Sequence, residues 1–266
     1  MTVALFFAPH DMETTGMHIE HGGEGPDLLL LLHGMGATGA VWSPMLAEAG
    51  ARWHGRWMAP DLPGHGQSGR QVSYAPGQIA ASVARAVLPH LDPAGRLVVL
   101  GHSLGGVVAL ALATGWFGVA PHRVFGSGIK VAWSEDEVRR MDSLAAQPAR
   151  RFATQEEAWD RYLKVSGLAG IAGAASCAVA RGIAHETDGW QLAMDPRANG
   201  VGKPPLAELL TLARCPVHLG RGAHDAMVTI EQTRLFDPEA RDLGPNGHNV
   251  MVEAPGTVWD WLASFD

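Results

Sequence analysis

Residues 97–106 read Leu97-Val98-Val99-Leu100-Gly101-His102-Ser103-Leu104-Gly105-Gly106, and the apolar stretch 107–113 follows directly. The run before Gly101 predicts a strand, and the serine then stands on a sharp turn into a helix. Glycines two residues before and after Ser103 fit so tight a turn, because side chains there would collide. The stretch therefore predicts a nucleophile elbow, a strained turn that lifts a serine hydroxyl clear of a sheet. An ordinary strand-to-helix turn with an incidental serine is the alternative.

Buried strands and helices alternate along most of the chain. The continuous apolar run Leu28-Leu29-Leu30-Leu31-Leu32 ends at His33-Gly34, which is typical of a strand buried on both faces of a parallel sheet. Similar runs recur at 57–59, 97–100, 123–125 and 216–219, and helical patterns lie at 41–49, 78–91, 104–114, 230–235 and 257–265. Residues 5–7 and 17–20 predict an opening antiparallel pair. The alternation predicts an α/β fold with a mostly parallel sheet that helices cover on both sides.

The alternation lapses between residues 128 and 205. Three helices without intervening strands are expected there, at 134–144, 155–165 and 170–182. Glycine- and proline-rich clusters bound the segment at 126–128 and 200–205, as expected of hinges. We therefore expect a core made of residues 1–128 and 206–266, with a helical cap inserted at 129–205.

Composition favours a small-molecule substrate over nucleic acid or a membrane. The chain has 266 residues, of which 47% are hydrophobic and 18% charged, and its net charge is −7. Because no run of Lys or Arg occurs, nucleic acid is not an expected partner. The stretch 167–184 is poor in large apolar side chains and contains Arg181, which disfavours a membrane span.

Two further patterns bear on location and cofactors. The apolar run near the N-terminus, about five residues long, is too short for the core of a signal peptide. The two cysteines, Cys177 and Cys215, have no metal-type spacing, so a reducing cytoplasmic compartment is expected. Neither a nucleotide-binding loop nor a His-Glu-x-x-His pattern occurs, so we expect no cofactor and no metal.

A serine nucleophile needs a base and a carboxylate that orients the base. Asp225 follows the predicted strand at 216–219 in a glycine-rich loop, and His248 lies on a loop before the last helix. The order Ser103, Asp225, His248 is that of a Ser-Asp-His relay built on an α/β sheet. The alternatives are a turn or helix-capping aspartate and a loop histidine bonded to backbone.

Attack by Ser103 on a carbonyl would create an oxyanion that backbone N–H groups must face. Leu104, which follows the serine, is expected to supply one such N–H group. Met35, in the His33-Gly34-Met35-Gly36 loop after the strand at 28–32, is expected to supply the second. The other interpretation of Met35 is a simple wall of the pocket.

These residues together resemble a known family, the α/β-hydrolase-fold serine hydrolases with a helical cap, which include esterases, lactonases and carbon–carbon bond hydrolases. The matching residues are 33–36, 61–68, 101–106, Asp225, and Gly247-His248 with Glu253 and Pro255. The resemblance implies a mostly parallel sheet of eight strands and the catalytic residues Ser103, Asp225 and His248. It also implies that 61–68 is a structural turn. Relatives that open epoxides or remove halides carry aspartate where this chain has Ser103, so those activities are not expected.

Aromatic side chains of the cap suggest how a substrate is held. Trp133 and Trp190, together with Trp159, fall in the insertion, where an aromatic lid would exclude water and hold an apolar acyl or ring group. The alternative is that they form the cap's own small core. One of the cap's several arginines is a candidate clamp for a substrate carboxylate, but the sequence does not select it.

The sequence thus predicts a cytoplasmic, cofactor-independent serine hydrolase, monomeric or homodimeric, that cleaves a small ester or lactone through an acyl-enzyme. Cleavage of a carbon–carbon bond in a ring-fission product by the same residues is one alternative. A non-catalytic receptor for a small molecule on the same fold is the other, because fold alone does not decide function.

Overall fold

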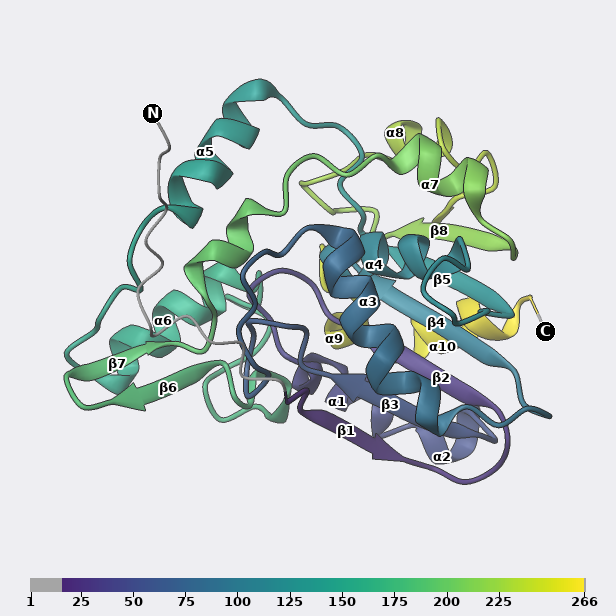
Figure 1. The fold of residues 1–266 in the computed structure, drawn as a ribbon, viewed down its shortest axis with the longest axis horizontal. Coiled ribbons are helices and arrows are strands. Elements are labelled where there is room, and N and C mark those ends of the chain that lie inside the picture. Colours follow the sequence, from purple (N-terminus) through teal and green to yellow (C-terminus); the bar gives the residue numbers. More distant parts are fainter. Residues whose placement is uncertain (1–15, 266) are drawn as a thin grey trace, which may run out of the picture.

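The computed structural model describes residues 16–265, and within them one sheet of seven strands forms the centre of the molecule (Figure 1). The spatial order is β1-β3-β2-β4-β5-β8-β9, in which only the β1–β3 pair is antiparallel. The strands are β1 (Ile19–Gly22), β2 (Leu28–Leu32), β3 (Arg56–Pro60), β4 (Leu97–His102), β5 (Arg123–Ser127), β8 (Val217–Arg221) and β9 (Arg241–Asp242). The mostly parallel sheet is confirmed. The expected strand at 5–7, which would raise the count to eight, lies outside the described residues.

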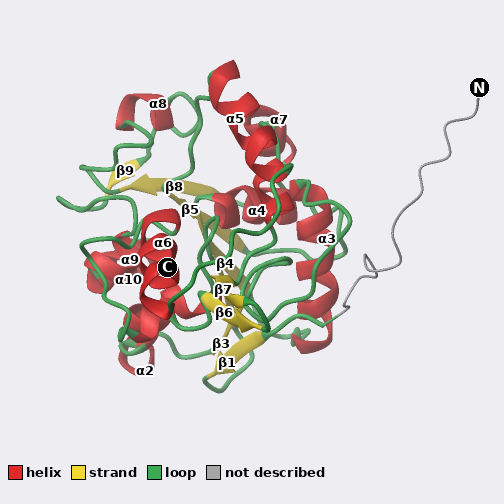
Figure 2. Ribbon diagram, turned by 90° about the vertical axis from the view of Figure 1, so that its left-hand side faces the viewer, coloured by secondary structure: helices red, strands yellow, loops and turns green. Residues whose placement is uncertain are grey.

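Helices cover both faces of this sheet, with α3 and α4 on one side and α9 and α10 on the other (Figure 2). The core helices are α1 (Ser43–Leu46), α2 (Ala49–Arg52), α3 (Pro76–Val87), α4 (Leu104–Ala113), α7 (Leu206–Leu212), α8 (Ile230–Arg234), α9 (Val250–Glu253) and α10 (Pro255–Ala263). Short 3-10 turns are η1 (Gly39–Trp42) and η2 (Leu88–His90). None of the described helices is long and apolar enough to cross a lipid bilayer.

The leucine run of β2 explains why helices lie on both faces. Leu28, Leu30 and Leu32 pack into the hydrophobic cluster beneath α3 and α4, whereas Leu29 and Leu31 pack into the cluster on the α10 side. All five side chains are buried, and each contributes about 1.5–3 kcal/mol relative to an exposed position. A strand that alternates between two cores needs large apolar residues at every position.

Strand register brings several loops together at the carboxyl ends of the sheet. Leu32 of β2 pairs with Gly101 of β4, and His102 of β4 pairs with Ser127 of β5. Ser127 in turn pairs with Gly220 of β8. The loops that leave these strands therefore start side by side, which is where parallel α/β sheets place their ligand sites.

The insertion between β5 and α7 is only partly helical. It contains α5 (Glu135–Ala145), α6 (Gln155–Val165), η3 (Cys177–Val179), η4 (Pro196–Gly200) and a hairpin of β6 (Ile183–Glu186) and β7 (Gly189–Leu192). The first two predicted helices are confirmed, but the third, at 170–182, is wrong, as is the absence of strands. Each glycine in a helix costs about 1 kcal/mol, and this segment has Gly170 and Gly173. The hairpin turn consists of Thr187 and Asp188, and the Asp188-Gly189 dipeptide is its local sequence signal.

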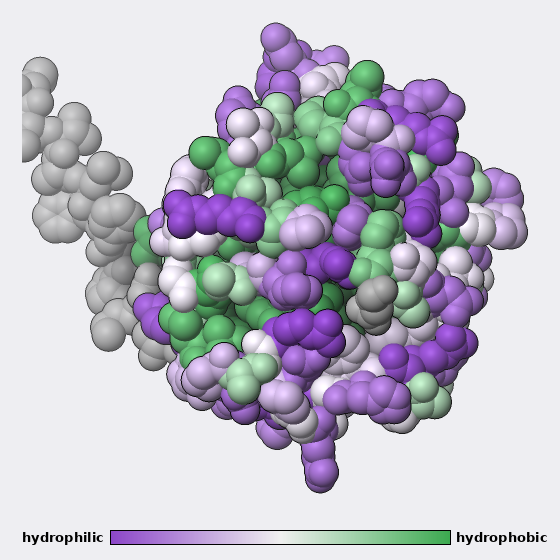
Figure 3. Space-filling view, turned by 90° about the vertical axis from the view of Figure 1, so that its right-hand side faces the viewer, coloured by the Kyte–Doolittle hydropathy of each residue, from purple (hydrophilic) through white to green (hydrophobic). Residues whose placement is uncertain are grey.

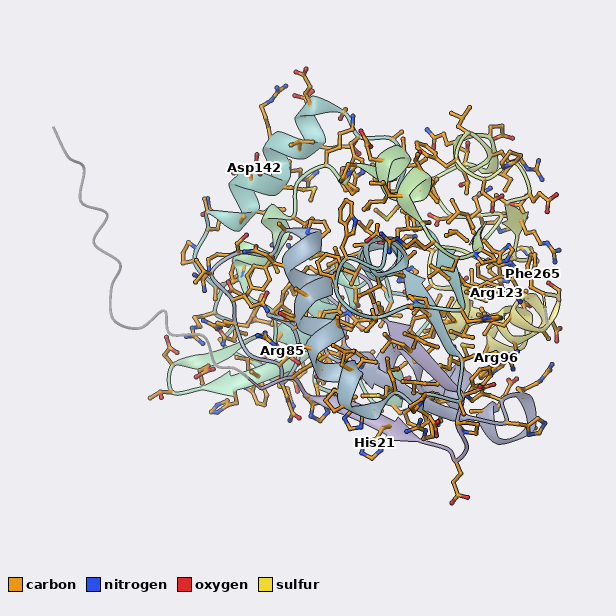
Figure 4. The ribbon with its side chains drawn as sticks, turned by 45° about the vertical axis from the view of Figure 1, so that its right-hand side comes forward. His21, Arg85, Arg96, Arg123, Asp142 and Phe265 are labelled. Carbon is orange, nitrogen blue, oxygen red and sulfur yellow. The ribbon has the colours of Figure 1, made fainter. Side chains whose placement is uncertain are left out.

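Away from the insertion, the surface in Figure 3 mixes hydrophilic and hydrophobic side chains. Two arginines, Arg123 and Arg241, contact Phe265 near the C-terminus. Arg123 and Phe265 lie together in Figure 4, where the guanidinium donates to the backbone oxygen of Phe265. Arg241 lies over the ring of Phe265, 4.6 Å from its centroid.

Candidate active site

Ser103 stands on a strained turn between β4 and α4. Its φ of 50° and ψ of −113° are rare for a residue with a side chain, and its N–H donates to the Ser127 carbonyl at 2.8 Å. A Cβ at Gly101 would lie 2.2 Å from the Gly105 carbonyl oxygen, and a Cβ at Gly105 would lie 2.1 Å from that of Leu32. The two glycines therefore allow helix α4 to start directly against the strands, as the sequence predicts.

Asp225 and His248 form a hydrogen-bonded pair beside this turn. The Nδ1 atom of His248 lies 2.8 Å from Oδ2 of Asp225, whose carboxylate is fully buried, while the histidine side chain is 17% exposed. The other carboxylate oxygen of Asp225 accepts the N–H of Met227 at 2.8 Å. Since Nδ1 donates to the carboxylate, Nε2 is left with its lone pair and is able to act as a base.

Ser103 and His248 line the same cavity, which has a volume of about 510 Å³. No hydrogen bond joins their side chains in the part of the chain that the structure describes. Such contacts are often long in ligand-free enzymes and shorten when substrate binds. The structure thus brings Ser103 and His248 to one cavity, and Asp225 is hydrogen-bonded to the imidazole.

The two expected oxyanion donors also line this cavity. Met35 and Leu104 are both among its lining residues, and neither backbone N–H has a hydrogen-bond acceptor within residues 16–265. Leu104 is the first residue of α4, so its N–H belongs to the unpaired amides of a helix N-terminus, where partial positive charge gathers. A negatively charged oxygen near Ser103 would meet these free donors.

The loop that carries Met35 is fixed by a neutral histidine. The His33 ring donates from Nδ1 to the Gly34 carbonyl and accepts the Leu62 N–H at Nε2, both at 2.8 Å. Burial, together with the neighbouring His65, lowers the pKa of His33 to about 3. Because the ring stays neutral, both hydrogen bonds persist across the physiological pH range.

The 61–68 turn is structural, as the resemblance implies. Asp61 is fully buried and accepts hydrogen bonds from the N–H groups of Gly39 at 2.7 Å and Gln67 at 3.0 Å. Arg181, from the insertion, donates to the same carboxylate through Nε at 3.0 Å and also binds Glu20. Asp61 therefore joins the insertion to the core and does not face the cavity.

The tryptophans of the insertion differ in position. Trp133 lines the cavity, and Nζ of Lys130 lies 5.0 Å from the centroid of its ring. Trp190 lies on β7 against His185, with ring centroids 4.7 Å apart, and is not a lining residue. Trp159 packs on Tyr162 at 5.7 Å. Only Trp133 of these three lies where it would touch a substrate, and its role stays a prediction.

His102 is a site residue that the sequence does not single out. It lines the cavity, its Nε2 lies 2.9 Å from the backbone oxygen of His248, and the two rings are 4.5 Å apart. Burial, with the nearby His248, holds the pKa of His102 well below its ordinary value. The neutral ring therefore donates from Nε2 to this carbonyl, which fixes the loop of His248. In the G-x-S-x-G pattern the residue before the serine is unspecified, so no sequence signal marks it.

No group of three or more His, Cys, Asp or Glu side chains within residues 16–265 is arranged to hold a metal ion. The cavity wall carries the Ser103 alcohol and the His248 imidazole, and the imidazole is bound to the Asp225 carboxylate.

The sequence pattern of the alpha/beta hydrolase family matches residues 29–261. The chain belongs to this family.

Curated relatives match this chain over only a part of their own length. The chain is 42% identical to a pimeloyl-[acyl-carrier protein] methyl ester esterase of Aeromonas hydrophila over 97 residues, which are 36% of this chain and 35% of the relative. It is 37% identical to the dihydrolipoyllysine-residue acetyltransferase component of an acetoin cleaving system of Pseudomonas putida over 123 residues, 44% of this chain and 30% of the relative. The matches thus span about a third of these relatives.

Solved structures of other members of the family agree with the fold over almost the whole chain. A thioesterase domain from the curacin biosynthetic pathway superposes with a TM-score of 0.74 at 19% identity, covering 93% of this chain and 94% of that one. The N-acyl homoserine lactonase AidH gives 0.70 at 21% identity, covering 96% and 95%. At such identities the likeness establishes the alpha/beta hydrolase fold alone.

Proposed function

We propose that the protein is a serine hydrolase that cleaves a small carboxylic ester or lactone through an acyl-enzyme. One observation carries the proposal: Ser103 on its strained turn and His248, which is hydrogen-bonded to the buried Asp225, line one cavity together with Met35 and Leu104, whose backbone N–H groups are unpaired within residues 16–265. Methyl ester esterases among the relatives support an ester as the substrate.

In the first half of the proposed reaction, the Ser103 hydroxyl attacks the ester carbonyl while Nε2 of His248 takes its proton. The carbonyl oxygen becomes an oxyanion that accepts hydrogen bonds from the Met35 and Leu104 N–H groups. When this intermediate collapses, the bond to the leaving alcohol breaks, and His248 gives the proton to that alcohol. Ser103 is then acylated.

In the second half, a water molecule gives a proton to His248 and attacks the acyl carbonyl. The same two N–H groups bind the second oxyanion. Its collapse releases the acid, and the proton on His248 returns to Ser103. Asp225 keeps the imidazole in the tautomer that has a free Nε2 and stabilises the imidazolium that forms in each half.

Covalent labelling tests the proposal directly. A fluorophosphonate probe at pH 7.5 is expected to add one phosphonyl group to the wild-type protein, on the peptide that carries Ser103, and none to Ser103→Ala. Wild type is also expected to release p-nitrophenol from p-nitrophenyl butyrate with an initial burst that matches the enzyme concentration.

Three outcomes would count against the proposal. A wild-type protein without an adduct would indicate the receptor alternative. Rapid cleavage of a dienoate ring-fission product with negligible ester turnover would indicate the carbon–carbon hydrolase. Equal turnover by Ser103→Ala would exclude the serine as the nucleophile.

A further inference from the structure

The insertion contributes positive charge to the cavity wall. Of its seven arginines, Arg140 alone is a lining residue. Several of the others are held elsewhere: Arg139 by Glu135 and Asp136, Arg151 by Asp188, and Arg181 by Glu20 and Asp61. The structure therefore selects one arginine from a set that the sequence leaves undivided.

A second cation reaches the cavity from another helix. Arg140 lies on α5 and Lys164 on α6, and both line the cavity. Val165, next to Lys164, contacts the loop of Met35, because a Cβ at Gly36 would lie 2.6 Å from its Cγ1 atom. Lys164 is thus placed close to the proposed oxyanion donors, on the cap side of the cavity.

Neither cation is neutralised within residues 16–265. No ion pair or hydrogen bond of the Arg140 or Lys164 side chain exists among these residues, and both residues are exposed. Lys130 also lines the cavity, but its ammonium group is paired with Glu137, which lines the cavity too. After that pair is counted, the wall keeps two positive charges in a protein whose net charge is −7.

Much of the cavity wall is apolar. Leu104, Val107, Met141 and Leu144 are among its lining residues. A cavity with an apolar wall and a few placed charges suits a chain that is hydrocarbon in the middle and charged at one end. The planar fork of an arginine and the ammonium of a lysine both bind carboxylates.

We infer that the cavity takes esters carrying a free carboxylate remote from the scissile bond, which Arg140 and Lys164 bind. The inference rests on the proposed function, since it assigns a substrate class to the same site. Arg140 and Lys164 are binding residues, and the hydrolytic steps remain those of Ser103 and His248.

Two esters that differ in one terminal group test this inference. Monomethyl adipate and methyl hexanoate have the same four methylenes, but the first ends in a carboxylate where the second has a methyl group. The measured quantity is the ratio of their kcat/KM values, obtained from methanol release at pH 7.5. We expect the wild-type ratio to exceed one.

Loss of either cation is expected to reduce this preference. Arg140→Gln and Lys164→Gln are each expected to lower the ratio about tenfold, mainly through the KM of the adipate ester, because each removes a cation that binds the substrate carboxylate. Raising the salt concentration from 0.05 to 0.5 M lowers the wild-type ratio as well, since salt screens exposed charges. Arg139→Gln, one residue away and outside the cavity, leaves the ratio unchanged.

The outcomes separate this inference from the proposed function. If the protein hydrolyses methyl hexanoate through Ser103 but both cation variants keep the wild-type ratio, or Arg139→Gln lowers it equally, the carboxylate site is wrong and the hydrolase remains. If wild type cleaves neither ester and takes up no phosphonyl label, the proposed function itself is wrong. Thermal melting of each variant verifies that it folds.

Discussion

The imidazole of His102 holds the backbone of His248: its Nε2 atom lies 2.9 Å from that residue's carbonyl oxygen. The loop of His248 is fixed at two further points, by the Gly247 N–H to Glu253 and by the His224 N–H to the Asn246 carbonyl, at 2.8 and 2.9 Å. The residue that precedes the proposed nucleophile is thus a positioning residue for the proposed base.

Substitutions of His102 are expected to distinguish positioning of His248 from a contribution to the stability of the fold. His102→Phe leaves the His248 carbonyl without its donor, and loosening of the base is expected to lower kcat about tenfold with a smaller change in KM. His102→Gln places an amide N–H near the Nε2 position and restores most of the activity. The check is the kcat and KM of both variants with p-nitrophenyl butyrate, at temperatures where both are folded. Wild-type kcat in His102→Phe would show that the contact does not position the base.

Asp225→Asn tests the proposed role of the carboxylate. The amide keeps the size of the side chain but favours the wrong tautomer of His248, so kcat is expected to fall by about 10³–10⁴. Asp242→Asn is the matched control, because Asp242 on β9 pairs with Arg221 of β8, whereas Asp225 is the carboxylate that binds His248. A kcat within tenfold of wild type in Asp225→Asn would contradict a Ser-His-Asp mechanism.

Much of this arrangement is predictable because it follows from local rules. The Gly-x-Ser-x-Gly turn, the continuous leucines of β2 and the loops that carry Asp225 and His248 each depend on neighbours in the sequence. Parallel strands then bring their carboxyl ends to one edge of the sheet. The confirmed fold follows from those features, and the structure places Ser103 and His248 on one cavity, with Asp225 hydrogen-bonded to His248.

Contacts between distant segments could not be predicted in this way. Trp133 and Trp190 are equivalent in the sequence, and only packing of the insertion decides that Trp133 lines the cavity. Arg181 is likewise one arginine among seven in the insertion until the structure places it on Asp61, 120 residues away. Such pairings depend on how two layers meet, which no local periodicity encodes.

Acid is expected to destabilise the protein through its buried neutral histidines. Burial lowers the pKa of His33 to about 3, whereas the same side chain titrates near 6.5 in an unfolded chain. Between these values the unfolded chain binds one more proton, so the free energy of unfolding falls as pH drops below about 6.5. The slope is about 1.4 kcal/mol per pH unit for one histidine. The pKa values of His65 and His102 are lowered too, mainly by burial, so they act in the same direction.

His33→Gln checks this dependence. The glutamine carbonyl replaces Nε2 as acceptor for the Leu62 N–H but takes up no proton in this range. Urea unfolding between pH 5 and 7 is expected to show a slope smaller by up to about 1.4 kcal/mol per pH unit below pH 6 than in wild type. Identical slopes in the two proteins would mean that His33 takes up its proton equally in the folded and unfolded states, which would contradict its lowered pKa.

The ion pair between Arg181 and Asp61 is expected to stabilise the fold. Arg181→Met leaves the Asp61 carboxylate buried without its cation, which costs about 3–5 kcal/mol. Arg139→Met, which removes two exposed ion pairs, is expected to cost less than about 1 kcal/mol. Urea unfolding at pH 7 gives the free energy of unfolding of both variants. An equal decrease in Arg181→Met and Arg139→Met would exclude a stabilising role for the buried Arg181–Asp61 pair.

The stability that the Arg181–Asp61 ion pair provides depends on pH in a defined direction. Burial alone would raise the pKa of Asp61, but hydrogen bonds from Arg181 and from the Gln67 N–H lower it below its ordinary value of 3.8. The stabilisation is therefore present above pH 3.8 and lost as pH falls through the lower pKa of the folded state. In Arg181→Met the buried carboxylate lacks its cation and takes up a proton at a higher pH than in wild type, so the difference in stability between the two proteins is expected to narrow as pH falls toward 4 and below.

Helix α5 buries none of its side chains, whereas α6 buries Ala158 and Tyr162 and the segment at Arg181 is fastened to the core. In Figure 4 the label of Asp142 marks α5 at the edge of the molecule, away from the sheet. Backbone amides of an element with so little burial open at low free-energy cost and exchange hydrogen early. Because Arg140 lies on this helix, slower amide exchange in α5 would report that a ligand occupies the cavity, even for molecules that the protein never turns over.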